Sequence, residues 1–245
     1  MRVVILAGGK GTRISEESKL IPKPMIEIGN VPILERVMSV YEHQGFNDFI
    51  FLTGYKSNYI VSHFMSCMDY DKTKDGIVLR DSKRTITIIY TGLDTLTGGR
   101  LGYLKNVVCE PFLMTYGDGV GNIKIQDTID IFNSENSLVT VTAVHPAGRF
   151  GSVILEENKV IYFGEKTDNS NQWINGGFMV IHPKTLEYID GQDTNFEMDV
   201  LPVISEMGKL SAYRHTGFWM CMDTLRDKEN LEDVLNTKGE IWLNM

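Results

Sequence analysis

Hydrophobic residues in the first half of the chain follow two alternating patterns, and each pattern predicts a different element. Short unbroken apolar runs, rich in β-branched residues, are typical of strands that are buried on both faces. Longer segments with apolar residues three and four positions apart predict helices that bury one stripe. The expected strands are 2–7, 49–53, 85–90, 112–116 and 138–144, and the expected helices are 32–44 and 58–68.

Residues 32–44 also carry start and stop signals for a helix. Pro32 suits the first turn, where a backbone N–H is not needed, and Gly45 suits the stop. Further on, residues 69–83 are polar and charged, which predicts a loop or an edge hairpin.

The second half of the chain has shorter apolar runs, separated by Gly and Asn turns. Strands are expected at 152–156, 160–163 and 178–182, and helices at 183–189, 197–207 and 225–235. The alternation of strands and helices predicts an α/β fold, with one mostly parallel sheet, helices on both faces and a small β-rich extension. With no repeat or linker, residues 1–245 are expected to form a single domain.

Composition excludes several classes of protein. A net charge of −8 argues against binding to duplex nucleic acid, because phosphate backbones are bound by basic surfaces. The apolar runs are too short for a membrane span, and no signal-peptide pattern is present, so we expect a cytoplasmic protein without membrane contact. Cys67, Cys109 and Cys221 show no paired spacing that would indicate zinc or a disulfide framework.

A glycine-rich segment, LAGGKGTR at residues 6–13, follows the first predicted strand. Glycines let a backbone approach a phosphate closely, so the loop is a candidate phosphate site, and a plain tight turn is the alternative. It lacks the third glycine of the dinucleotide fingerprint, where Ile14 stands, and the ending of a P-loop. Lys23 lies between Pro22 and Pro24, which would hold it in an extended loop; a solvated surface lysine is the alternative.

Two aspartates complete the candidate chemistry. Asp118 follows a predicted strand between two glycines, and Asp223 lies between an apolar run and a predicted helix. Magnesium takes one or two carboxylates together with phosphate oxygens, so this pair would suffice for Mg²⁺. A turn residue is the alternative for Asp118, and a helix N-cap is the alternative for Asp223.

In their order along the chain, these motifs resemble those of the sugar-1-phosphate nucleotidyltransferases, most closely the glucose-1-phosphate cytidylyltransferase branch. The resemblance covers nearly the whole chain. It rests on residues 6–13, Pro22-Lys23-Pro24, 97–100, 116–119, 148–151, Glu165-Lys166, 175–177 and 222–227. The implied fold is Rossmann-like, of the nucleotide-diphospho-sugar transferase type, with a nucleotide-binding part at 1–144 and a sugar-binding part with C-terminal helices at 145–245.

The resemblance implies roles for individual residues. Arg13, Lys23 and Asp118 would be catalytic, and Asp118 and Asp223 would hold Mg²⁺. Glu165, Lys166, Asn175 and Gly176 would bind the sugar phosphate. CTP would be bound by Leu6, Ala7, Gly8, Gly9, Lys10, Gly11, Thr12, Arg13, Lys23, Thr95, Arg100 and Gly117.

The implied reaction is in-line attack by a sugar 1-phosphate on the α-phosphorus of CTP, which gives a CDP-sugar and pyrophosphate. The family also implies a homo-oligomer, with a hexamer as one form. Departures from the family pattern, such as Thr167 and Asp168 after Glu165-Lys166, lie mainly on the sugar side. Glucose 1-phosphate is therefore the first choice, with another hexose or a heptose 1-phosphate, or another nucleoside triphosphate, as alternatives.

Two other classes remain to be weighed against an enzyme of this kind. A catalytically inactive nucleotide-binding regulatory subunit would be expected to lose a metal aspartate or the loop arginine, whereas Asp118, Asp223 and Arg13 are present. A nicotinamide oxidoreductase is disfavoured by Ile14 in the glycine loop.

Overall fold

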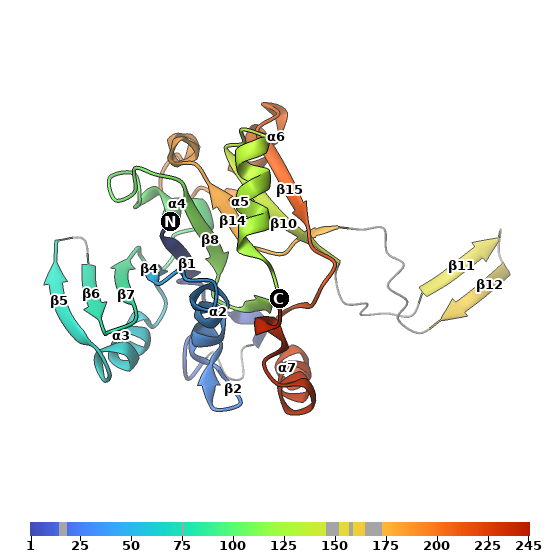
Figure 1. The fold of residues 1–245 in the computed structure, drawn as a ribbon, viewed down its shortest axis with the longest axis horizontal. Helices are drawn as coiled ribbons and strands as arrows, with labels where there is room; N and C mark the ends of the chain where they lie inside the picture. The colour runs from blue at the N-terminus through green and yellow to red at the C-terminus, as the bar shows by residue number, and fades with distance from the viewer. Residues whose placement is uncertain (15–18, 75, 146–151, 157–158, 165–172) are drawn as a thin grey trace.

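Four parallel strands form the centre of the main sheet. The structure is a computed structural model that describes residues 1–14, 19–74, 76–145, 152–156, 159–164 and 173–245. The central strands, in spatial order, are β8 (Phe112–Tyr116), β1 (Val3–Ala7), β4 (Asp48–Thr53) and β7 (Thr85–Tyr90). Figure 1 shows them running through the middle of the molecule.

Antiparallel strands extend this centre on both sides. Beyond β7 lie β6 (Gly76–Arg80) and β5 (Asp69–Thr73), which form the hairpin expected at an edge. Beyond β8 lie β14 (Met179–Ile181), β10 (Val139–Val144) and β13 (Ile174–Asn175), and β15 (Leu210–Arg214) pairs with β10 in parallel. The predicted α/β fold with a parallel core is confirmed, and the second half of the chain extends its sheet.

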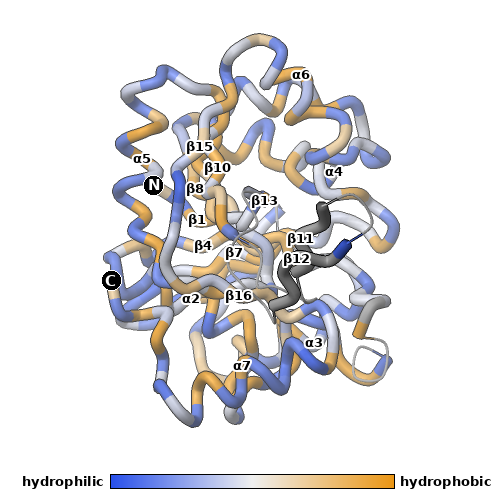
Figure 2. Tube along the Cα trace, turned by 90° about the vertical axis from the view of Figure 1, so that its right-hand side faces the viewer, coloured by the Kyte–Doolittle hydropathy of each residue, from blue (hydrophilic) through white to orange (hydrophobic). Residues whose placement is uncertain are grey.

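The central strands are buried because their side chains supply two separate cores. Along β1, Val3 and Ile5 belong to one hydrophobic cluster, whereas Val4 and Leu6 belong to the other. Successive side chains of a strand point to opposite faces, so an unbroken apolar run is the pattern that a doubly covered strand requires. Figure 2 shows hydrophobic segments gathered along the central strands, beneath mixed segments on the outside.

Helices cover both faces of the sheet, as predicted. The first core is completed by α2 (Ile33–Glu42), α3 (Ser57–Met65), α5 (Ile125–Ser134) and α7 (Leu225–Lys238). The second is completed by α4 (Thr97–Gly102), α6 (Leu201–Glu206) and the 3₁₀ helix η3 (Pro183–Tyr188). Helices α4 and α5 were not expected from the sequence, and the predicted helix at 183–189 is a 3₁₀ helix.

Among the residues that the structure describes, three small two-stranded sheets lie outside the main sheet. They are β2 (Glu27–Ile28) with β3 (Val31–Pro32), β9 (Gly119–Gly121) with β16 (Trp219–Cys221), and β11 (Ser152–Glu156) with β12 (Lys159–Gly164). The β11–β12 pair corresponds to the two predicted strands at 152–156 and 160–163. Among the described residues, no helix combines the length and apolar character that crossing a membrane requires.

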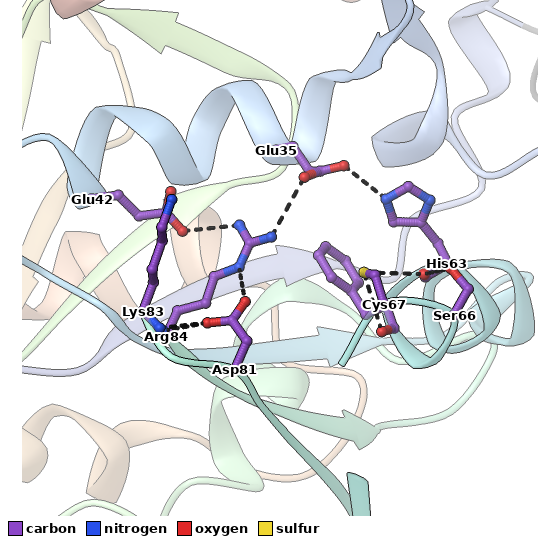
Figure 3. A network of polar contacts seen from close by, with 9 residues as sticks. Glu35, Glu42, His63, Ser66, Cys67, Asp81, Lys83 and Arg84 are labelled. Atoms are coloured by element: carbon purple, nitrogen blue, oxygen red, sulfur yellow. Dashed lines mark hydrogen bonds and ion pairs between the residues drawn. The ribbon is translucent and has the colours of Figure 1, made fainter. Parts of the chain in front are cut away.

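A polar network links α2 to the turn between β6 and β7 (Figure 3). Arg84 bonds to Glu42 at 3.0 Å and lies within 3.4 Å of Asp81 and 3.7 Å of Glu35. Glu35 also contacts His63 of α3 at 2.7 Å. Burial lowers the pKa of Arg84, but the three carboxylates outweigh it and raise the pKa above its ordinary value. The network connects the turn between β6 and β7 to α2 and α3.

Candidate active site

A cavity of about 350 Å³ lies where β1 and β8 end. This volume is in the range of small-molecule sites, and the carboxyl ends of parallel strands are where open α/β sheets bind ligands. Residues from six separate parts of the chain line it: Leu6, Ala7, Gly8, Gly9, Gly11, Thr12, Lys23, Pro24, Thr95, Leu96, Thr97, Arg100, Tyr116, Gly117, Asp118, Asn195 and Asp223.

The predicted glycine loop forms one wall of this cavity, and the structure explains why two of its residues are glycine. A Cβ added to Gly8 would lie 2.3 Å from Nη1 of Arg100, so a side chain there would collide with the guanidinium group. Gly11 has a φ of +62°, in the left-handed region that glycine adopts without strain. Its carbonyl accepts from the N–H of Ile14 at 3.1 Å, which closes the 3₁₀ turn η1 (Thr12–Ile14).

Arg100 is buried behind the glycine loop, where it bonds to neutral oxygen atoms. Its guanidinium donates to the carbonyls of Gly8 (3.0 Å), Thr53 (3.1 Å) and Gly92 (2.9 Å) and to the hydroxyl of Thr91 (2.6 Å). These acceptors lie at the end of β4 and just after β1 and β7, so one side chain connects the ends of three parallel strands. Burial lowers the pKa of Arg100 because it disfavours the charged form.

The antiparallel pairing of β9 and β16 brings the two predicted metal aspartates together. Gly119 pairs with Cys221, and the N–H of Met222 donates to the carbonyl of Asp118 at 2.9 Å. Asp118 comes just before β9 and Asp223 just after β16, so the register places both at the same end of this ladder. Their convergence therefore depends on two three-residue strands that the sequence did not predict.

The start of α7 leaves the carboxylate of Asp223 available to the cavity. Thr224, not Asp223, is the N-cap residue, and its side chain accepts from the backbone N–H of Asp227. The carboxylate of Asp227 accepts in return from the N–H of Thr224 at 2.8 Å, which completes a capping box. It also accepts from the N–H of Asp223 at 3.1 Å. The helix end is thus satisfied without the side chain of Asp223.

Lys23 lies between the two aspartates. Its ammonium nitrogen is 2.6 Å from Oδ2 of Asp118 and 2.7 Å from Oδ1 of Asp223, and its side chain is 12% exposed. Burial by itself would lower the pKa of Lys23, but the two carboxylates outweigh it and raise the pKa above its ordinary value. The backbone is fixed in the 3₁₀ turn η2 (Lys23–Met25), which follows extended Pro22. The alternative of a solvated surface lysine is therefore wrong.

The donor set fits a divalent cation that is bound together with a substrate. Two carboxylates converge on one point, which a cationic nitrogen occupies in this structure. The described residues contain no cluster of three or more His, Cys, Asp or Glu side chains that could hold a metal by themselves. Magnesium commonly takes only one or two carboxylates and completes its shell with phosphate oxygens and water. Asp118 and Asp223 match that arrangement.

A second polar group at the cavity was not predicted as part of the site. Tyr116 and Thr97 line the cavity, and both donate hydroxyl hydrogen bonds to the carboxylate of Glu197, from Thr97 at 2.5 Å. Glu197 lies in η4 (Phe196–Val200), a π-helical turn, and such turns are frequent at functional sites. Burial, followed by the charge of Glu197, raises the pKa of Tyr116, so its hydroxyl stays protonated.

The other predicted site residues lie in different positions. Lys10 forms an exposed ion pair with Asp94 at 2.6 Å and does not line the cavity. Asn175 and Gly176 also lie off the cavity wall; the carbonyl of Gly176 accepts from the indole N–H of Trp219 at 2.8 Å. Glu165, Lys166 and the side chain of Arg13 fall outside the described part of the chain.

The whole chain is similar to known proteins. The family model described as nucleotidyl transferase matches residues 2–227. Glucose-1-phosphate cytidylyltransferase of Salmonella typhi is 40% identical over 99% of this chain and 98% of its own length. The catalytic subunit beta of mannose-1-phosphate guanylyltransferase of Drosophila melanogaster is 27% identical over 92% of this chain and 60% of its own length.

A solved structure shares the same architecture. The crystal structure of HddC from Yersinia pseudotuberculosis superposes with a TM-score of 0.71, covering 95% of this chain and 98% of that one at 25% identity. The likeness spans both the parallel centre and the antiparallel extension of the sheet.

Proposed function

The chain belongs to the nucleotidyl transferase family, and on this premise we propose that it transfers the cytidylyl group of CTP to a sugar 1-phosphate, with α-D-glucose 1-phosphate as first choice. The observation that carries the proposal is the meeting of Asp118, Asp223 and Lys23 beside a glycine loop, in a cavity of about 350 Å³. Whole-length similarity to a glucose-1-phosphate cytidylyltransferase supports this choice of substrates.

The proposed reaction is a single displacement at phosphorus. A phosphate oxygen of the sugar 1-phosphate forms a bond to the α-phosphorus of CTP as the bond to the bridging oxygen of the β-phosphate breaks. The products are a CDP-sugar and pyrophosphate. A phosphate monoester is already nucleophilic, so positioning and charge neutralisation can supply the catalysis without a general base.

The residues divide into groups by their place around the cavity. Backbone N–H groups of the loop at Gly8, Gly9 and Gly11 would hold the phosphates, and Lys23 with Arg13 would neutralise the leaving pyrophosphate. Thr95 and Arg100 are proposed for the base, and Glu165, Lys166, Asn175 and Gly176 for the sugar phosphate. Mg²⁺ on Asp118 and Asp223 would neutralise phosphate charge when bound.

Glu197 and its two hydroxyl donors extend this proposal toward substrate positioning. Because Tyr116 and Thr97 line the cavity and bond to Glu197, this cluster holds the wall next to Asn195 in one conformation. A wall held in one conformation can discriminate between substrates, most strongly where its polar groups hydrogen-bond to substrate hydroxyls.

Other substrates within the same chemistry are the alternative. The guanylyltransferase relative indicates that the same scaffold accommodates another base, and another hexose or a heptose 1-phosphate would need changes only on the sugar side. An inactive regulatory subunit is disfavoured because Asp118, Asp223 and Lys23 are all present and assembled.

A substrate matrix tests the proposal directly. CTP, UTP, dTTP, ATP and GTP are each combined with a panel of sugar 1-phosphates, and pyrophosphate release is measured with Mg²⁺ present. We expect the highest kcat/KM for CTP with glucose 1-phosphate. Equal rates with all five triphosphates would refute the proposed preference for the cytosine base. The absence of pyrophosphate in every combination would refute the proposed enzymatic activity.

The proposal also includes a cytoplasmic homo-oligomer, as the family resemblance implies. Size-exclusion chromatography with light scattering gives the mass directly. A particle of 27.7 kDa, the mass of one chain, would contradict the oligomer.

A further inference from the structure

The position of Lys23 has a consequence for how the metal reaches the site. We propose that Lys23 occupies the cation position of the nucleotide-free enzyme and competes with the divalent metal, so that the metal binds tightly only together with the triphosphate. This inference rests on the proposed function, because it takes Asp118 and Asp223 as the metal ligands. It adds an order of binding that the ligand assignment alone does not contain.

The competition follows from shared carboxylate groups. The ammonium nitrogen of Lys23 lies 2.6 Å from Oδ2 of Asp118 and 2.7 Å from Oδ1 of Asp223. Mg²⁺ coordinates carboxylate oxygens at about 2.1 Å and would need oxygens of the same two groups. Two cations in one such position would repel each other at short range. The metal and the ammonium group therefore exclude each other.

Lys23 can leave this position by a side-chain movement alone. Its backbone is fixed in η2, where the N–H of Ile26 donates to the carbonyl of Lys23 at 3.1 Å. The four-carbon stem is flexible, and the side chain already lines the cavity that the glycine loop encloses. The ammonium group can thus turn from the aspartates to an anion in the same cavity.

Whether the metal can favourably replace the ammonium group of Lys23 depends on the triphosphate. When metal binds alone, Lys23 loses both carboxylates, and a largely buried cation is left without a partner, which is costly. When a nucleotide binds as well, its phosphates become the new partners of Lys23, while they also supply ligands to the metal. Metal affinity should therefore be low in the absence of nucleotide and high in its presence.

Titration with Mn²⁺ alone, followed by electron paramagnetic resonance, tests the proposal without any turnover. Mn²⁺ is a spectroscopic probe that prefers the same oxygen ligands. The free enzyme is compared with Lys23→Met, which keeps the length of the side chain and removes the charge, and with Lys23→Arg, which keeps the charge. The matched control is Lys10→Met, which removes a lysine of the glycine loop whose ion pair with Asp94 is exposed.

We expect Lys23→Met to bind Mn²⁺ at least about tenfold more tightly than the unaltered chain, because the ammonium group that bonds to both carboxylates is removed. Lys23→Arg should stay weak, and Lys10→Met should change the affinity by no more than about twofold. With CTP present, the advantage of Lys23→Met should disappear, because Lys23 no longer contacts the aspartates in the unaltered enzyme.

Two different negative results separate this inference from the proposed function. If Lys23→Met binds Mn²⁺ no more tightly than Lys10→Met, while Asp118→Asn still weakens binding, the competition is refuted and the metal ligands stand. If Asp118→Asn and Asp223→Asn bind Mn²⁺ as well as the unaltered chain, the metal assignment itself is wrong. Circular dichroism of each variant confirms that it is folded.

Discussion

Two cations in the described part of the chain, Arg84 and Lys23, each lie among carboxylates, and their surroundings differ. Arg84 lies among Glu35, Glu42 and Asp81 in the turn between β6 and β7, and Figure 3 shows these contacts. Lys23 lies between Asp118 and Asp223 at the cavity. Both side chains are largely buried, at 17% and 12% exposure, and both have raised pKa values.

The difference lies in what surrounds each cluster. The carboxylates around Arg84 come from α2 and from the adjacent turn, and the guanidinium also lies 5.8 Å above the ring of Phe64. Its interactions are completed by the protein. The carboxylates around Lys23 follow β8 and β16 and line an open cavity together with glycines. A paired cation thus indicates function only when the surrounding space can admit a ligand.

The strongest way to break this comparison is to neutralise one acid in each cluster. Asp118→Asn or Asp223→Asn should lower kcat by about a thousandfold or more, because a developing phosphate charge loses its metal. Thermal unfolding should change little, since Lys23 keeps one carboxylate. Glu42→Gln makes the same chemical change beside Arg84 and should leave pyrophosphate release intact. Comparable losses in Glu42→Gln and Asp118→Asn would contradict the distinction.

Removing the structural cation should have the converse effect. Arg84→Met leaves three carboxylates facing one another, so we expect the free energy of unfolding to fall by about 2–3 kcal/mol with kcat unchanged. Chemical denaturation measures the loss. Arg80→Met is the control, because the ion pair of Arg80 with Asp71 is exposed and should contribute less than about 1 kcal/mol. Equal losses at both positions would show that burial does not matter here.

Arg100 extends the comparison, because it is also a buried cation but is bonded to neutral oxygens at the cavity. Arg100→Lys cannot reproduce a planar fork that reaches four acceptors, so the glycine loop should lose its fixed position. We expect the KM for CTP to rise about tenfold, or about 1.4 kcal/mol in binding, with a smaller change in kcat. Steady-state kinetics with varied CTP measure both constants. A fall in kcat with KM unchanged would contradict a positioning role.

The smallest predicted effect is on the stability of the fold at low pH. Burial acts against the charge of Asp81, but the N–H groups of Lys83 and Arg84 and the guanidinium of Arg84 outweigh it and lower the pKa of Asp81. A carboxyl group whose pKa is lower in the folded state stabilises the fold at pH values above its unfolded-state pKa. This contribution is lost as the pH falls through the folded-state pKa. The free energy of unfolding of the unaltered chain should therefore exceed that of Asp81→Asn by less than about 1 kcal/mol near neutral pH. An advantage that persists unchanged below about pH 2 would contradict this assignment.

The sheet and the glycine loop were predictable because each is encoded locally. β1 is an unbroken apolar run that ends in glycines, and the structure places Gly8, Gly9 and Gly11 at the cavity. Helix α5 was missed although Ile125, Ile129 and Phe132 are buried at helical spacing, a signal that a count of apolar positions would have found.

The remaining parts of the site depend on contacts between distant residues, which no local pattern contains. β9 and β16 are three residues each, too short for a periodic signal, yet their register brings Asp118 beside Asp223. The position of Lys23 between these acids, and the bonds of Glu197 to Tyr116 and Thr97, likewise arise from tertiary packing alone. The sequence identified the acids and the lysine but not their contact.

The ladder between β9 and β16 also affects when activity begins in the life of a chain. Asp223 is synthesised 200 residues after Lys23, so at 5–20 residues per second a ribosome needs about 10 to 40 s to add it. Until then, a nascent chain that already contains the glycine loop lacks one of its two acids. On the proposed role of Asp223, such an unfinished polypeptide would not yet turn over the nucleotides that it meets.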